Sequence, residues 1–80
     1  MGIKITSFIK IEFGNSEKFN EELKQIPEVV KILSISGDFD LLIHILVEKS
    51  EDLVEIIEKI EKIPGIKEIN SHYVLAEWEK

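Results

Sequence analysis

The chain of 80 residues contains no cysteine and no arginine, and it has only two prolines and one tryptophan. The absence of cysteine excludes disulfides and sites in which cysteine binds zinc or an iron–sulfur cluster. Two histidines do not make a metal site by themselves, so we expect no metal and no cofactor. A chain this short buries only about 60–65% of its unfolded surface, so its core is marginal. Association between chains is the remaining route to stability.

The absence of arginine also limits the kinds of binding partner that the sequence favours. The net charge is -6, and the lysines are scattered among glutamates instead of forming a basic stripe. Because phosphate contacts dominate nucleic-acid binding, we expect no direct nucleic-acid binding by this chain alone. The apolar runs at residues 41–43 and 45–47 are far shorter than the ~20 residues that cross a bilayer. No signal peptide opens the chain, so we expect a cytoplasmic protein that does not insert into membranes.

Hydrophobic residues make up 44% of the chain, and 15 residues are isoleucine, which favours a packed core over disorder. Apolar and polar residues alternate with period two over residues 3–13, which predicts a long half-buried strand. Phe8 breaks the pattern on the polar face. Residues 14–16 offer a helix N-cap, and Phe19, Leu23 and Ile26 then follow at helical spacing. We expect this first helix to end at Pro27.

The second half of the chain repeats this plan. Residues 29–36 predict a strand, Gly37 and Asp38 a turn, and residues 40–47 a strand that is apolar on both faces apart from His44. Ser50 is the expected N-cap of a second helix that ends at Pro64-Gly65. Residues 66–78 predict the last strand. The buried stripe of the second helix is expected at Leu53, Ile56, Ile57, Ile60 and Ile63.

The order of elements is therefore βαββαβ. Each half consists of a strand, a helix, an Ile-Pro pair and a second strand, with the pairs at residues 26–27 and 63–64. Right-handed crossovers in two such halves predict an α+β, ferredoxin-like fold, a split βαβ sheet with strand order 4-1-3-2. We expect one domain over residues 1–80, with a four-stranded antiparallel sheet and both helices on one face.

This arrangement leaves the other face of the sheet uncovered. On the third strand that face is expected to carry Leu42, His44 and Leu46 or their neighbours. A large apolar face is not left in contact with water in a monomer. We therefore expect a face-to-face dimer with the two sheets about 10 Å apart.

The densest polar feature is the segment Ser36-Gly37-Asp38-Phe39-Asp40. Its carboxylates could bind the amine of a ligand while turn amides hold a carboxylate; the alternative is that Gly37 and Asp38 simply form a hairpin turn. His44 in its apolar strand is typical of a hydrogen-bonded core or interface histidine. His72 and Tyr73 lie on opposite faces of the last strand, and nothing in the pattern aligns them for proton transfer. No catalytic residue is assigned.

Residues 37–43, Gly-Asp-Phe-Asp-Leu-Leu-Ile, resemble the GD(Y/F)D-Φ-L-Φ stretch of the effector-binding domain of the Lrp/AsnC family, also called the RAM domain. Residues 64–66, Pro-Gly-Ile, followed by residues 71–75, Ser-His-Tyr-Val-Leu, resemble the family's PGV…T-x-(I/V)VL ending, with Ser71 in place of the common threonine. The resemblance covers essentially the whole chain. The family's regulators carry an N-terminal helix-turn-helix, whereas this chain begins at the first strand, so it resembles a stand-alone RAM protein.

The resemblance implies a homodimer that assembles into a ring of dimers, with amino-acid effectors bound between neighbouring dimers. The positions carried over from the family are Gly37, Asp38, Phe39, Asp40 and Leu42, with Ser71 and His72 facing them from a neighbouring chain. The leading hypothesis is an amino-acid-binding and oligomerisation module without a DNA-binding domain. It would modulate Lrp-type regulators or amino-acid metabolism through a partner, either a full-length regulator with the same domain or a metabolic enzyme.

Two alternatives remain open. One is a small enzyme of the dimeric α+β-barrel kind, such as an isomerase or a cofactor-free monooxygenase. It would use His44, His72, Tyr73 or Asp40 in a pocket between helices and sheet. The other is a purely structural assembly module. A polar cleft between dimers would favour the sensor, and an enclosed pocket lined by histidine within one chain would favour the enzyme.

Overall fold

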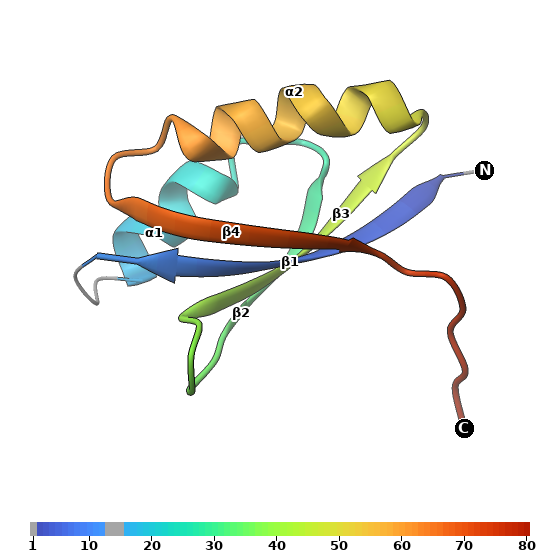
Figure 1. The fold of residues 1–80 in the computed structure, drawn as a ribbon, viewed down its shortest axis with the longest axis horizontal. Helices are drawn as coiled ribbons and strands as arrows, with labels where there is room; N and C mark the ends of the chain where they lie inside the picture. Colours follow the sequence, from blue (N-terminus) through green and yellow to red (C-terminus); the bar gives the residue numbers. More distant parts are fainter. Residues whose placement is uncertain (1, 13–15) are drawn as a thin grey trace.

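The computed structural model describes residues 2–12 and 16–80 and has the expected element order βαββαβ (Figure 1). Neither helix of the described chain has the length and apolar character needed to cross a membrane. The expected strand end at Phe13 and the residues Gly14 and Asn15 of the expected cap lie outside the described residues. The elements are β1 (Ile3–Ile11), α1 (Ser16–Leu23), β2 (Val29–Ser34), β3 (Leu41–Val47), α2 (Ser50–Glu61) and β4 (Ile66–Tyr73).

The four strands form one antiparallel sheet with the order β2-β3-β1-β4, which is the predicted order 4-1-3-2 read from the other edge. The long strand β1 lies at the centre, with Ile5 opposite both Ile45 of β3 and Tyr73 of β4. Both helices pack on one face of this sheet (Figure 1). The α+β, ferredoxin-like architecture is therefore confirmed.

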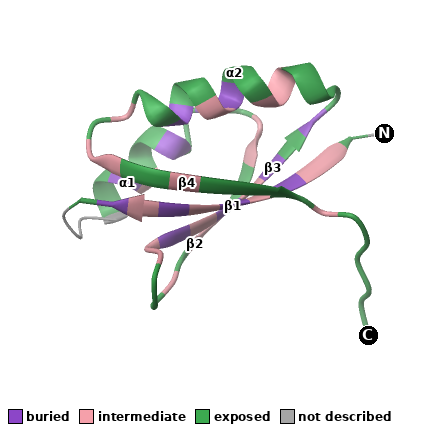
Figure 2. Cartoon of the chain, in the orientation of Figure 1, coloured by how far each residue is buried: buried purple, intermediate pink, exposed green. Residues whose placement is uncertain are grey.

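The core lies between the helices and alternate residues of the two central strands (Figure 2). Side chains alternate between the two faces of a strand, so period-two patterning places one set under the helices. The second helix contributes Ile56 and Ile60, at 2% and 0% exposure, which confirms its predicted apolar stripe. The buried residues of β1 and β3 are Ile5, Ser7, Ile9, Ile11, Leu41, Ile43, Ile45 and Val47.

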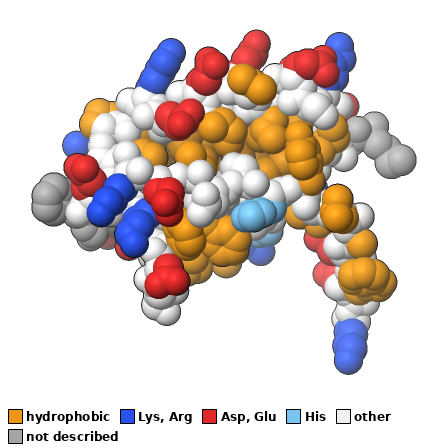
Figure 3. All heavy atoms as spheres, viewed as in Figure 1, with side chains coloured by type: hydrophobic (Ala, Val, Ile, Leu, Met, Phe, Trp, Pro, Cys, Tyr) orange, Lys and Arg blue, Asp and Glu red, His pale blue; other side chains and the backbone are white. Residues whose placement is uncertain are grey.

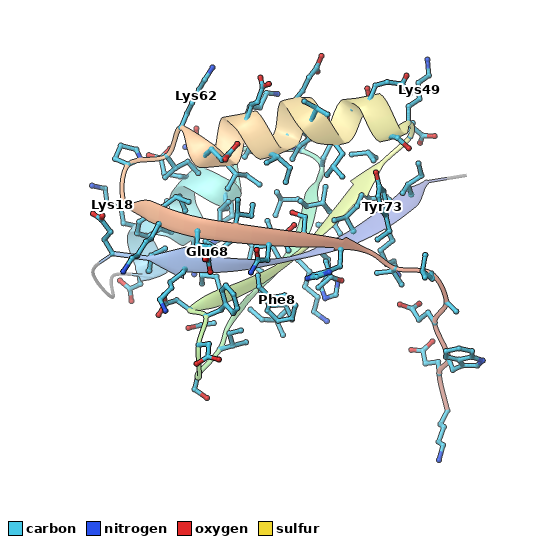
Figure 4. The ribbon with its side chains drawn as sticks, viewed as in Figure 1. Phe8, Lys18, Lys49, Lys62, Glu68 and Tyr73 are labelled. Atoms are coloured by element: carbon cyan, nitrogen blue, oxygen red, sulfur yellow. The ribbon has the colours of Figure 1, made fainter. Side chains whose placement is uncertain are left out.

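The opposite face of the sheet is not covered by either helix. It carries the residues that alternate with the core set, and we call it the open face. Leu42 and His44 are half-buried there, and Leu46 is 44% exposed. Of the two sets of β3 residues that the sequence left open for this face, the structure places Leu42, His44 and Leu46 there. Phe8 of β1 pairs with Leu42 and points away from α2 (Figure 4). Its position outside the apolar alternation therefore places it on the open face.

Two helix boundaries differ from the prediction. The first helix ends at Leu23 instead of Pro27, and the buried Ile26 lies in the following turn, where its N–H donates to the Leu23 carbonyl at 3.1 Å. The second helix has Lys49 as its N-cap, so the assignment of the cap to Ser50 was wrong. The reason is that the Asp52 carboxylate accepts the Lys49 N–H at 3.3 Å, so the capping hydrogen bond forms at Lys49, one residue before Ser50.

The internal repeat is visible in the two turns that follow the helices. In both turns an isoleucine N–H donates to the carbonyl three residues earlier, and the N–H of the first residue of the next strand donates to the carbonyl of that isoleucine. The accepting carbonyls belong to Leu23 and Ile26 in the first turn and to Ile60 and Ile63 in the second. The last strand ends at Tyr73, so the prediction that it reaches Trp78 was wrong. Beyond Tyr73, the Val74 N–H donates one further bond, to the Lys4 carbonyl at 3.0 Å. Because β1 starts at Ile3, only one residue of β1 lies beyond Lys4 for the chain after Val74 to pair with.

Candidate functional site

The loop between β2 and β3 carries most of the predicted site residues. Gly37 and Asp38 lie exposed at its tip, and Gly37 has φ +109°, a conformation open to glycine and strained for other residues. The loop closes where the Ile35 N–H donates to the Asp40 carbonyl at 3.0 Å. Within residues 2–12 and 16–80, the amide N–H groups of residues 36–39 donate no hydrogen bond to the protein. The tip therefore offers free amides beside the Asp38 carboxylate.

Asp40 has a structural role at the base of this loop. Its Oδ2 accepts the Ile11 N–H at 2.9 Å, and its own N–H donates to the Ile9 carbonyl at 2.9 Å. These bonds extend the pairing of β3 with β1 beyond the last strand residues. Of the two carboxylates in the loop, Asp40 therefore holds the loop in place, and Asp38 is the one that faces solvent.

The Asp40 contact predicts a measurable loss of stability. Asp40→Ala leaves the part-buried Ile11 N–H without its acceptor, so the free energy of unfolding should fall by about 1–3 kcal/mol. Asp40→Asn keeps an oxygen at that place and should recover most of the loss. Asp38→Ala, at an exposed position, should stay within about 0.5 kcal/mol. Urea unfolding measures all three variants, and equal losses for Asp38→Ala and Asp40→Ala would contradict the assignment.

Three aromatic rings meet on the open face beside the loop. The Phe39 ring lies 5.6 Å from the Phe8 ring, tilted by 48°, and the His72 ring lies 6.1 Å from Phe8 in an edge-on arrangement of 76°. We call these three residues the aromatic cluster. Sequence reasoning noted only that Phe8 breaks the alternation of its strand on the polar face, and did not include it among the site residues. The signal that could have included Phe8 in the site was its position on the polar face of β1, because an aromatic ring there needs another side chain to pack against.

Ser71 lies on the other face of the sheet. Its hydroxyl is 2.7 Å from the Ser7 hydroxyl, and Ser7 is fully buried on the side of the helices. Within one chain the structure therefore brings Phe39 and His72 together through Phe8, with Leu42 as the β3 neighbour of Phe8. It does not bring Ser71 to this group. The hydroxyl of Ser71 is engaged in satisfying the one buried polar side chain of the described core.

The geometry of the two histidines bears on the enzyme alternative. His44 and His72 both pair with Thr6 from its two neighbouring strands, so they lie on the open face and not between sheet and helices. Two hollows in the described surface lie beside α1 and β2, and neither contains a histidine or a predicted site residue. In residues 2–12 and 16–80, His, Asp and Glu side chains form no group of three that could hold a metal ion.

The fold and the loop together define a ferredoxin-like domain whose β2–β3 hairpin carries a Gly-Asp-Phe-Asp tip. The sequence profile of the Lrp/AsnC ligand binding domain matches residues 6–80, which is nearly the whole chain. The chain therefore belongs to the Lrp/AsnC family through its ligand-binding domain.

Individual relatives agree with this assignment. The HTH-type transcriptional regulator FL11 of Pyrococcus horikoshii is 29% identical over 77 residues, which cover 94% of this chain and 51% of the regulator. The chain thus spans about half the length of the curated relatives it matches. The crystal structure of FFRP-DM1 has a TM-score of 0.84 at 24% identity, and the match covers 91% of this chain and 99% of that one. A regulator from Neisseria meningitidis, NMB0573, solved in complex with L-Met, has a TM-score of 0.85 at 17% identity, with 98% and 53% covered.

Proposed function

We propose that this domain binds a free amino acid at the β2–β3 loop and couples that binding to assembly. The observation that carries the proposal is the loop tip, where the exposed Asp38 carboxylate stands beside amides that have no acceptor in the described part of the chain. An amino acid presents the complementary pair, an ammonium for the carboxylate and a carboxylate for the amides. The ligand-binding family and the L-Met complex of the Neisseria regulator support this chemistry.

The side chain of the ligand would meet the aromatic cluster. Phe39 belongs both to the loop and to the cluster, so a ligand held at the loop tip extends towards Phe8 and His72. Aromatic faces favour apolar, thioether or aromatic groups. Within its own chain Ser71 lies on the other face of the sheet and bonds to Ser7, so a contribution of Ser71 to the site would have to come from a neighbouring chain.

Assembly is the second half of the proposal. We infer that the open face packs on the open face of a second copy and that such dimers close into a ring with ligands at their contacts. The support is the apolar content of the open face, including Phe8, Leu42 and the 44% exposed Leu46, which neither helix covers. The output in the cytoplasm would be association with the same domain of a full-length HTH-type regulator, since the relatives carry a second half beyond this domain.

A ligand screen tests the binding step. Free amino acids are added one at a time at millimolar concentration while the melting temperature is measured, and calorimetry follows every positive result. A ligand bound only to the native protein at a hundred times Kd stabilises it by about 2.7 kcal/mol, which is about 10–20 °C for a domain of this size. Light scattering in the same samples should report a change in assembly. No shift with any amino acid would overturn the proposal.

A matched pair of variants locates the site. Asp38→Asn removes the charge that receives the ammonium and should weaken binding at least tenfold, because bonds to charged groups contribute about 1.5–3 kcal/mol. Glu61→Gln, an equally exposed carboxylate at the end of α2, should leave the affinity unchanged. Calorimetry measures both. Unchanged binding in Asp38→Asn would place the ligand elsewhere on the domain.

A further inference from the structure

A row of polar side chains crosses the open face from one edge of the sheet to the other. Lys31 of β2 lies opposite His44 of β3. Thr6 of the central strand β1 lies opposite His44 on one side and His72 of β4 on the other. Residues paired directly across neighbouring strands share a face of the sheet, so we call these four the polar row. Both histidines of the chain therefore belong to one surface.

The polar row lies close to the middle of the sheet. Thr6 is adjacent to Ser7, the central residue of β1 (Ile3–Ile11). Thr6 and His44 are half-buried in the single chain, whereas His72 is exposed. Figure 3 shows histidine atoms at the surface beside hydrophobic side chains. A second copy that packs on the open face would therefore withdraw the polar row from water together with its apolar surroundings.

The charged groups around the polar row leave it without a carboxylate of its own. Lys31 is its one permanent charge and lies beside His44. The strand register places three further charged residues on the open face, Lys4 and Lys10 on β1 and Glu68 on β4. Lys4 pairs with Glu77 at 3.0 Å, and Lys10 stands opposite Glu68.

On the side of β2, the residue to consider is Glu28, which precedes the strand. Its carbonyl accepts the Leu46 N–H at 2.9 Å, two positions along β3 from His44. None of the four members of the polar row is itself acidic. A protonated histidine in the row would therefore have Lys31 and the other histidine as its charged neighbours across the strands, and no anion among them.

Protonation of the histidines would change the charge of the polar row threefold. Histidine changes its charge between pH 5 and 8. With both rings neutral the row carries one positive charge in each copy, and with both rings protonated it carries three. Withdrawing an unpaired charge from water costs far more than withdrawing a neutral ring. Two protonated rows on facing sheets about 10 Å apart would also repel each other.

We propose that the polar row makes association through the open face depend on pH. Two copies associate while His44 and His72 are neutral, and they separate as these rings take up protons. This inference rests on the face-to-face dimer of the proposed function and names its regulation. Because the separated copies bind more protons than the dimer, the association is fully present above the range in which histidine titrates and is lost as the pH falls through that range.

Sedimentation of the unmodified protein at about pH 7.5 and about pH 5.5, at constant ionic strength, measures the effect. Each proton taken up on separation contributes up to about tenfold per pH unit, so the dissociation constant of the dimer should rise at least tenfold. Circular dichroism of the same samples should show a folded chain at both values. An unchanged dissociation constant overturns the inference alone, and so does unfolding at the lower pH, because the separated copies must remain folded.

Variants assign the effect to the polar row. His44→Gln combined with His72→Gln removes both histidines of a chain that has no cysteine, so no side chain with an ordinary titration in this interval remains. Its dissociation constant should stay within twofold between the two pH values. Glu61→Gln, which changes an exposed carboxylate on α2, should keep the full tenfold rise. A tenfold rise that persists in the double histidine variant overturns the inference.

The failure of this inference can be distinguished from that of the proposed function. An unmodified protein that is monomeric at about pH 7.5 overturns the proposed assembly and the pH dependence together. A dimer that is indifferent to pH overturns the pH dependence and leaves the assembly in place. The amino-acid-induced shift in melting temperature tests ligand binding independently of both.

Discussion

Ile60→Ala is expected to lower the free energy of unfolding by about 2–5 kcal/mol. Ile60 is fully buried on α2, in the core that the helices form with β1 and β3. Removing three carbon atoms leaves a cavity that the surrounding side chains fill only in part. Because the total stability of a domain is about 5–15 kcal/mol, this loss is a large fraction of it. Urea or thermal unfolding of the purified variant gives the value.

The matched control for Ile60 lies on the same helix. Val54→Ala also shortens an apolar side chain, but Val54 is 60% exposed, so the change should stay within about 0.5 kcal/mol. The comparison separates burial from helix propensity. A loss at Val54 comparable to that at Ile60 would contradict the orientation of α2, and would mean that its outer side is covered in solution.

Gly65→Ala is expected to destabilise the domain by about 2–6 kcal/mol, from two causes. Gly65 has φ +95°, where a residue with a side chain is strained by about 1–3 kcal/mol. A Cβ at Gly65 would also lie 2.7 Å from Cζ of Phe19, a ring that is only 5% exposed, and such overpacking costs about 1–3 kcal/mol. The turn between α2 and β4 therefore requires glycine both for its backbone and for its contact with α1.

Gly37→Ala separates the two causes. Gly37 has a similar φ of +109°, but a Cβ there would meet no atom within 4 Å. Its loss should therefore contain the backbone part alone and be smaller than that of Gly65→Ala. Thermal unfolding of both variants measures the difference. If Gly37→Ala were as damaging as Gly65→Ala, the contact with Phe19 would not be the second cause.

The element order could be predicted because periodicity is a local signal. The alternation along β1 and the helical spacing of Ile56 and Ile60 each depend on neighbours within a few residues. The strand order then followed from the handedness of crossovers. The end of β4 could not be predicted in this way. The segment after Tyr73 remains rich in apolar residues, but a strand needs a partner, and the central strand β1 begins at Ile3.

The candidate site was predictable in part. The Gly-Asp-Phe-Asp segment is contiguous in the sequence, so its residue types and its turn were visible without a fold. The distinct roles of its two carboxylates could not be predicted, because the structural role of Asp40 depends on its hydrogen bond with the Ile11 N–H, which lies 29 positions away in the sequence. The link between Phe39 and His72 also depends on Phe8, which lies on a different strand from either.

The sequence by itself determined the types and order of the elements, the face of β1 that enters the core, and the presence of one acidic glycine turn. These properties depend on spacing along the chain. Only the tertiary structure decided that Ser71 turns towards Ser7, that Phe8 joins Phe39 and His72, and that Glu77 pairs with Lys4 of β1. The physical reason is that these contacts depend on which strands become neighbours and in which register, so they exist only after the sheet has formed.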